Sequence, residues 1–141
     1  MVLTMFDDYH ELCTEEEFIF FRERFIHMLQ GGTPTGKDSG FFHQAAFHRS
    51  HLLTFMPSTW LDRYIKYIDR FLGGVQSELI YLHAKRFPLL SDYMAFREYS
   101  VGGEWYRGLA EIELGFPVPD HIESHPHIMR ICALLARLIA W

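Results

Sequence analysis

One run of apolar residues, spaced alternately by four and three positions, constrains the fold of this chain more than any other feature of its sequence. The run comprises Leu61, Ile65, Ile68, Leu72, Val75, Leu79 and Leu82. Because an α-helix has 3.6 residues per turn, this spacing places the side chains along one face of a helix that packs on other helices. The helix is predicted to begin at residues 57–59.

An aromatic stripe lies beside this apolar face. It consists of Trp60, Tyr64, Tyr67 and Phe71 and continues to Gly74 and Glu78. The pair Gly73 and Gly74 would cost the helix about 2 kcal/mol relative to two alanines, so it needs a structural reason. Either the helix bends there or another segment comes close, and close packing is the preferred interpretation.

The other segments are helical by the same criterion, and no convincing strand is present. Thr14 and Glu17 form a capping box that opens a helix ending before Gly31. Further helices are predicted over residues 41–56, 89–100 and 104–114. A final helix, capped by Ser124, has one apolar side made of Ile128, Ile131, Leu135 and Leu138. The predicted fold is an all-α helical bundle, a single domain over residues 1–141 that we expect to be incomplete, because its last helix is apolar to the final residue.

Composition excludes several classes of function. The net charge is −5, and the basic residues are scattered, which argues against a nucleic-acid partner. The apolar run of residues 131–141 is shorter than the ~20 residues that span a bilayer, so no membrane span is predicted. Acidic residues begin at Asp7, before any apolar stretch develops, so no secretory signal is predicted. Cys13 and Cys132 form no Cys-x-x-Cys pair, so no zinc site or disulfide framework is implied. These features suit a cytoplasmic protein.

The motif Asp-Asp-Tyr-His-Glu near the start of the chain is the first candidate for chemistry. On a helix, Asp7, Asp8 and Glu11 share one side, where their like charges repel. A hard cation such as Mg²⁺ removes that repulsion by accepting carboxylate oxygens while it keeps positions for water and phosphate oxygens. A solvated acidic segment explains the same pattern without a metal.

Arg97 is the second candidate, because it lies just before a break in the helical pattern at Gly102 and Gly103. Its planar guanidinium suits phosphate oxygens, and the free carbonyls at the end of its helix can stabilise a cation. An ordinary exposed arginine is the alternative. The histidines offer a third possibility, a transition-metal site, but none forms the Glu-x-x-His pattern of helical di-iron proteins.

Taken in order, these motifs resemble the central part of the class I terpene synthases of microbial type. The order is the acidic motif, the long tryptophan-bearing helix with its inward glutamate, the Tyr-x-x-x-Arg helix of Tyr93 and Arg97, and the Gly-x-P-x-P turn at residues 115–119. The resemblance implies an all-α isoprenoid synthase-type fold, of which this chain is a part. It also implies that Asp7, Asp8 and Glu11 bind Mg²⁺.

The resemblance implies roles for residues around the helix break as well. Arg97 would sense the diphosphate, and Ser100 and Val101 would be the linker and effector residues. An aromatic cavity would bind the isoprenoid chain and shield its carbocation from water. Periodicity does not separate lining residues from core residues, and for each candidate a place in the core is the preferred alternative. The candidates for that lining are Phe6, Phe41, Phe47, Trp60, Tyr64, Phe71, Tyr93 and Phe96.

By this resemblance the substrate is an isoprenyl diphosphate, such as farnesyl or geranylgeranyl diphosphate, which the family ionises with Mg²⁺ and cyclises. The family's second metal motif, of the kind Asn-Asp-x-x-Ser-x-x-x-Glu, is absent here, so weak metal binding and slow or no turnover are expected. A catalytically inactive helical fragment or interaction module is therefore the alternative. The protein partner would be the remainder of the domain or a second copy of the chain.

Overall fold

The computed structural model describes residues 12–140, and the all-α prediction is confirmed there: this part of the chain is helical and has no strand. The helices are α2 (Glu15–Leu29), α3 (Gly40–Leu52), α4 (Ser58–His83), α5 (Leu90–Ser100), α6 (Gly103–Leu114), α7 (Asp120–Glu123) and α8 (Pro126–Ala140). Within the described residues, no helix is both long enough and apolar enough to cross a membrane.

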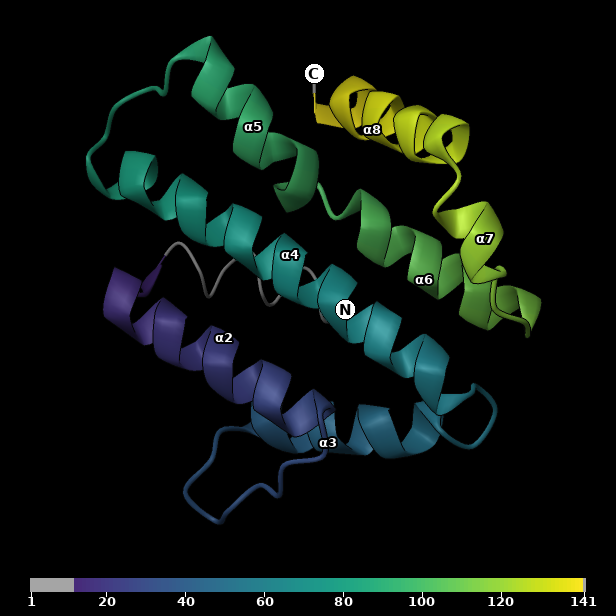
Figure 1. Cartoon of the computed structure of the whole chain (residues 1–141). Coiled ribbons are helices and arrows are strands. Elements are labelled where there is room, and N and C mark those ends of the chain that lie inside the picture. Colours follow the sequence, from purple (N-terminus) through teal and green to yellow (C-terminus); the bar gives the residue numbers. More distant parts are fainter. Residues whose placement is uncertain (1–11, 141) are drawn as a thin grey trace.

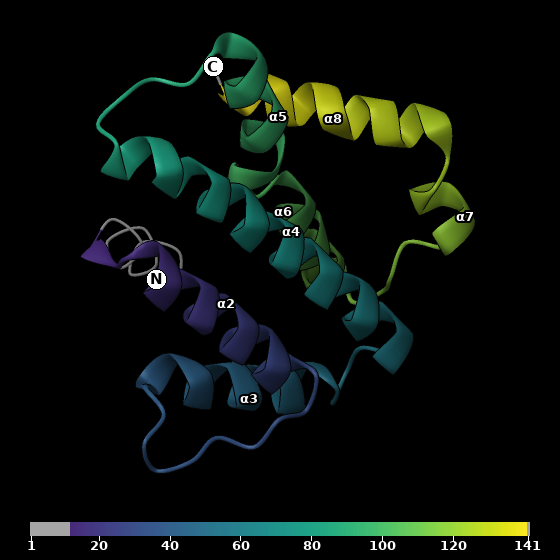
Figure 2. The same ribbon diagram turned by 60° about the vertical axis from the view of Figure 1, so that its left-hand side comes forward.

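Helix α4 is the central element of the bundle. Figures 1 and 2 show α2 and α3 on one side of α4 and α5 and α6 on the other, with α8 packed beyond α5. In both views the start of α2 lies at the end of the bundle where α4 ends. Among the described residues, the candidate site residues on α4, α5 and α6 are therefore positioned by α4 and the helices that pack on it.

The apolar face predicted for α4 forms the core. Six of its seven residues, Leu61 to Leu79 in the four-three pattern, are buried and belong to one hydrophobic cluster. The seventh, Leu82, is 45% exposed, so the prediction is wrong at that position. Leu82 lies in the last turn of α4, beyond Leu79, the last residue of this helix that its neighbours bury.

Helices α2 and α3 use phenylalanine for their mutual packing. The capping box is confirmed, since the Glu17 backbone N–H donates to Thr14 Oγ1 at 3.3 Å and the Thr14 N–H donates to Glu17 Oε2 at 2.8 Å. Inside the helix, the Phe21 ring lies 5.6 Å from that of Phe41 and 5.7 Å from that of Phe42. Helix α3 ends at Leu52, four residues earlier than predicted, because residues 53–56 turn toward α4.

The C-terminal segment corrects the prediction for Ser124. The short helix α7 was not expected, and Ser124 ends it: the Ser124 hydroxyl donates to the Asp120 carbonyl at 2.7 Å instead of capping α8. On the apolar side predicted for the last helix, Ile128 is half-buried, whereas Ile131, Leu135 and Leu138 are exposed. Small residues face the bundle instead, with Ala136 buried against Gly103.

A buried carboxylate ties α4 to α6. Glu111 is 3% exposed, accepts a hydrogen bond from Trp60 Nε1, and accepts two from Arg63 Nη2 at 2.8 and 3.2 Å. Arg63 Nη1 donates to the Val118 carbonyl at 3.1 Å and to Asp120 Oδ1 at 2.6 Å. The proline-containing connector after α6 is thus fixed to the first turns of α4 by hydrogen bonds to one arginine.

We expect Glu111→Ala to lower the free energy of unfolding by about 3 kcal/mol, because it leaves the Arg63 charge and the Trp60 N–H without their buried acceptor. As a control, Asp69→Ala removes the partly exposed partner of Arg22 and is expected to cost less than about 1 kcal/mol. Urea unfolding of both variants measures the difference. Equal effects would contradict a structural role for the buried carboxylate.

Candidate functional site

Arg97 lies in a three-residue cluster that spans α4 and α5. Its Nη1 donates to Glu78 Oε1 at 3.0 Å and to the Ser100 hydroxyl at 3.4 Å. The Ser100 hydroxyl donates in turn to the same Glu78 oxygen. Two of the residues predicted for the site, Arg97 and Ser100, are thereby brought together, and Glu78 joins them as an acceptor that the sequence analysis did not pair with Arg97.

The absence of a side chain at Gly74 allows this cluster to form. A Cβ atom at Gly74 would lie 2.7 Å from the Ser100 backbone nitrogen and 3.1 Å from the Phe96 carbonyl oxygen. Helix α4 continues through both glycines, so the preferred interpretation of close packing at this pair is confirmed for Gly74. The end of α5 therefore rests on the backbone of α4, one turn before Glu78.

The predicted break between two helices is present directly after Ser100. Helix α5 ends there, Val101 follows as its C-cap, and Gly102 has a φ of +74°, a left-handed conformation that glycine adopts without strain. Helix α6 starts at Gly103. The carbonyls of the last turn of α5 thus lie at the break, where a helix end carries partial negative charge.

Three of the predicted substrate contacts are core residues. The Trp60 ring stacks on Tyr64 at 4.8 Å, the Tyr64 hydroxyl accepts a hydrogen bond from Trp105 Nε1 at 2.7 Å, and the Phe71 ring lies 5.0 Å from that of Trp105. All three are buried in the hydrophobic cluster. Burial raises the pKa of Tyr64 to about 12. In the described structure these rings stabilise the packing of α4 on α6.

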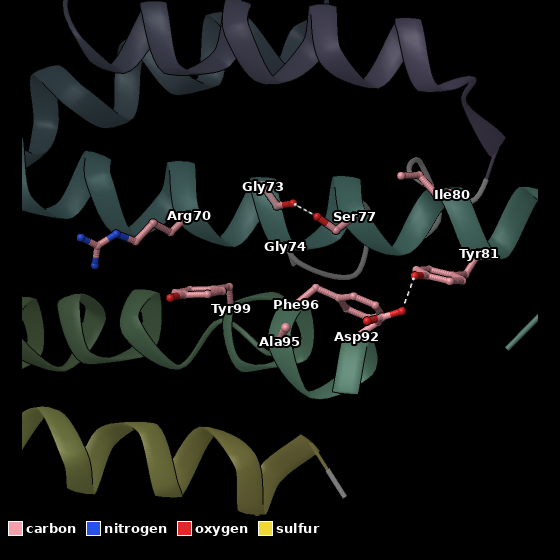
Figure 3. Close-up of a pocket in the computed structure, with 10 residues that line it drawn as sticks. All are labelled: Arg70, Gly73, Gly74, Ser77, Ile80, Tyr81, Asp92, Ala95, Phe96 and Tyr99. Carbon is pink, nitrogen blue, oxygen red and sulfur yellow. Dashed lines mark hydrogen bonds between the residues drawn. The ribbon is translucent and has the colours of Figure 1, made fainter. Parts of the chain in front are cut away.

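Of the other four described candidates, two lie on α3, where Phe41 packs against the core and Phe47 is exposed, and two lie on α5. Tyr93 is half-buried and packs edge-on against Phe96, with ring centroids 5.9 Å apart. Phe96 lines an open pocket of about 530 Å³ between α4 and α5 (Figure 3). The Tyr81 hydroxyl bridges this pocket by donating to Asp92 at 3.2 Å.

The pocket lies next to the Arg97 cluster, since Gly74, which lines the pocket, is in close contact with the Ser100 backbone. The pocket is lined by Arg70, Gly73, Gly74, Ser77, Ile80, Tyr81, Asp92, Ala95, Phe96 and Tyr99. Neither Arg97 nor Glu78 contributes to it, because successive residues of an α-helix are turned by about 100°. The pocket thus includes the candidate substrate contact Phe96 but not the Arg97–Glu78 pair.

The remaining predicted site residues, Phe6, Asp7, Asp8 and Glu11, lie outside the described part of the chain. Between residues 12 and 140, no group of three or more histidine, cysteine or acidic residues is arranged to hold a metal. The histidine-based metal site thus gains no support there. His48 is half-buried near Tyr64, and burial lowers the pKa of its imidazole.

Comparison with known proteins identifies the family to which the chain belongs. The family model for terpene synthase family 2, C-terminal metal binding, matches residues 1–141, the whole chain. The chain belongs to this terpene synthase family. The resemblance found in the sequence is thereby confirmed, and the domain is one that binds metal.

Two curated relatives of this terpene synthase chain are enzymes. It is 26% identical over 135 residues to germacrene A synthase from Nostoc punctiforme, covering 95% of this chain and 42% of the relative. It is 24% identical over 128 residues to a (+)-T-muurolol synthase from Roseiflexus castenholzii, described as cyclising (2E,6E)-farnesyl diphosphate, covering 89% of this chain and 39% of the relative. The chain therefore spans about two-fifths of the length of these relatives.

Solved structures show the same fold. The SVS_A2 protein, obtained by ancestral sequence reconstruction, superposes with a TM-score of 0.85 at 23% identity, over 96% of this chain and 42% of that one. A variant of the same protein gives a TM-score of 0.87 over 98% of this chain. The terpene synthase fold is thus shared even though fewer than a quarter of the residues are identical.

We expect Gly74→Ala to lower the free energy of unfolding by about 1–3 kcal/mol, because the new Cβ would collide with the backbone of α5. Gly73→Ala is the matched control. A Cβ at Gly73 would meet only the flexible end of Arg22, so this variant is expected to be neutral or more stable by up to about 1 kcal/mol through helix propensity. Urea unfolding of both proteins tests this; equal stabilities would rule out the proposed contact.

The raised pKa of Tyr64 predicts a pH dependence of stability. Because folding favours the neutral phenol, its contribution is complete below the ordinary pKa of about 10 and is lost as the pH rises from there toward about 12. The wild type should lose about 2–3 kcal/mol more than Tyr64→Phe across this window. Urea unfolding at a series of alkaline pH values measures it, and parallel pH curves would show that Tyr64 is not buried.

Proposed function

We propose that this chain forms part of the active site of a terpene cyclase that acts on an isoprenyl diphosphate. The observation that carries the proposal is the cluster of Arg97, Ser100 and Glu78 at the break between α5 and α6. Membership of the terpene synthase family supports it. The name of the curated muurolol synthase favours farnesyl diphosphate as the substrate, with geranylgeranyl diphosphate as the runner-up.

The direction of the chain supports a site shared by Arg97 and the acidic motif. Helix α2 begins at the end of the bundle where α4 ends, and Glu78 lies in the last third of α4. Asp7, Asp8 and Glu11 directly precede the start of the described chain at residue 12. Since n residues span at most about 3.5 Å each, we propose that these carboxylates approach the Arg97 cluster from that end.

We propose Mg²⁺ as the metal, because the three acidic side chains form the all-oxygen donor set that this hard cation prefers. When bound, Mg²⁺ would neutralise charge on the diphosphate and so assist its departure. Asp7, Asp8 and Glu11 would hold it. No metal geometry is implied by the residues that the structure describes.

The residues of the helix break would then assist ionisation. Arg97 would donate N–H bonds to diphosphate oxygens as the allylic carbon–oxygen bond breaks and its electron pair leaves with the diphosphate. The carbonyl groups of the last turn of α5, next to Ser100 and Val101, would face the positive charge left on the isoprenoid chain. Tyr93 and Phe96, half-buried on the same helix, are the described aromatic side chains that we retain as candidate substrate contacts.

We also propose that residues 1–141 are part of a larger domain. The chain matches only about two-fifths of each relative. In addition, α8 exposes five large apolar residues, a pattern typical of a surface that packs against further protein: Ile131, Leu134, Leu135, Leu138 and Ile139. A salt bridge of 3.1 Å between Arg137 and Glu98 joins the end of α8 to the turn of α5 that carries Arg97.

A thermal-shift assay with MgCl₂ and inorganic diphosphate tests the proposal. We expect the two together to raise the melting temperature, because ligands that bind the folded state stabilise it, and we expect Asp7→Asn combined with Asp8→Asn to abolish the shift. Glu15→Gln combined with Glu16→Gln is the matched control, since these acids are exposed in the first turn of α2 and have no assigned role. Gas chromatography of products from farnesyl diphosphate then tests turnover.

No stabilisation of the wild type, or equal shifts in both double variants, would favour the alternative of a catalytically inactive fragment or interaction module. Loss of the shift in the Asp7 and Asp8 variant alone would support the terpene cyclase. Stabilisation without product formation would support a metal–diphosphate site that needs the remainder of the domain for turnover.

A further inference from the structure

The contact between Arg97 and Glu78 uses fewer atoms than two other arginine–carboxylate pairs among the described residues, those of Arg24 with Asp38 and of Arg63 with Glu111. Arg24 binds both oxygens of Asp38 through two nitrogens, at 3.0 and 2.7 Å, and Arg63 reaches both oxygens of Glu111. Arg97, by contrast, engages Glu78 through one nitrogen and one oxygen. A guanidinium has five N–H donors in a planar fork, so this pair uses little of its capacity.

Two further observations show that Arg97, although bound to Glu78, has N–H groups left to bind a ligand. Its Nε is buried and has no hydrogen-bond partner among the described residues. Its side chain is nevertheless 34% exposed, and that of Glu78 is 24% exposed, so an incoming anion can reach the pair. A buried, unsatisfied donor raises the energy of this arrangement and favours exchange for a ligand with more acceptor oxygens.

Ser100 would keep the helix end in place during such an exchange. Its hydroxyl donates to the same Glu78 oxygen that accepts from Arg97. If Arg97 leaves, the Ser100–Glu78 hydrogen bond remains and still joins the end of α5 to α4. The contact of Ser100 with Gly74 holds the same turn independently of the charge on Arg97.

From these contacts we propose that Glu78 is a positioning residue that holds Arg97 in the substrate-free protein and gives it up to the diphosphate group. The inference rests on the proposed function, because it assumes that Arg97 receives the diphosphate. Glu78 thereby competes with the substrate for one guanidinium and sets both the affinity for diphosphate and the ease of its release. Its carboxylate recaptures Arg97 when the product diphosphate leaves.

The test is calorimetric binding of inorganic diphosphate in the presence of MgCl₂ to wild type and Glu78→Gln. Glutamine keeps a carbonyl oxygen for Ser100 and removes the charge that holds Arg97. Because a partly exposed ion pair contributes up to about five-fold to an equilibrium constant, we expect diphosphate to bind about five-fold more tightly to Glu78→Gln. Inhibition of turnover by inorganic diphosphate, where turnover is measurable, should strengthen by the same factor.

Glu98→Gln is the matched control for the loss of a negative charge. Glu98 is the residue after Arg97, its side chain is 25% exposed, and it pairs with Arg137 at 3.1 Å rather than with Arg97. We expect its replacement to change diphosphate affinity by less than about two-fold, since a solvent-screened charge without direct contact has a small effect.

A double-mutant cycle with Arg97→Ala separates two effects of Glu78→Gln: release of Arg97 to diphosphate, and the loss of a negative charge near the binding site. In the Arg97→Ala background, Glu78→Gln should not increase the affinity for diphosphate, because there is no guanidinium for which Glu78 and diphosphate compete. Equal tightening with and without Arg97, or weaker binding to Glu78→Gln, would overturn the inference while leaving the proposed function intact. Absence of diphosphate binding to the wild type would overturn both, so the two failures are distinguishable.

Discussion

The packing of the end of α5 on the bare backbone of Gly74 is the contact on which the rest of the candidate site depends. It brings the Ser100 backbone close enough to α4 that a single Cβ atom would collide with it. One turn later, Glu78 can then accept hydrogen bonds from both Ser100 and Arg97. The break between α5 and α6, with its free carbonyls, is fixed at the same point. The arginine that we propose for diphosphate binding and the helix end that we propose to face a cation thus depend on one close helix contact.

Local sequence patterns predicted much of this arrangement, since the interactions that they describe are local. The four-three spacing predicted the buried face of α4, the Thr14–Glu17 pattern predicted the start of α2, and Gly102 predicted the break after Ser100. Each depends on residues within a few turns of one another, so periodicity and capping chemistry suffice. The order of these patterns along the chain was also enough to indicate the terpene synthase family, which the match over the whole chain confirmed.

The features that sequence analysis missed are set by distant neighbours. No local pattern around Glu78 identifies Arg97, nineteen residues away, as its partner. The position of Glu78, four residues after Gly74, indicates only that it lies one turn beyond a close helix contact. The sequence around Glu111 is that of an ordinary acidic residue within a helix, and only the tertiary contacts with Trp60 and Arg63 show that its carboxylate is buried. In α8, the side that faces the described bundle carries the small residue Ala136, which the apolar pattern of this helix did not indicate. The core interpretation preferred for Trp60, Tyr64 and Phe71, by contrast, is confirmed.

A crystal structure of the protein grown with Mg²⁺ and inorganic diphosphate tests the central claim most directly. That claim is that Arg97 and the acidic motif bind one diphosphate from two sides. The account predicts diphosphate oxygens within hydrogen-bond distance of the Arg97 guanidinium, metal bound to Asp7 and Asp8, and Glu78 still hydrogen-bonded to Ser100. A diphosphate bound away from Arg97, or a metal held elsewhere while Asp7 and Asp8 face solvent, would contradict it.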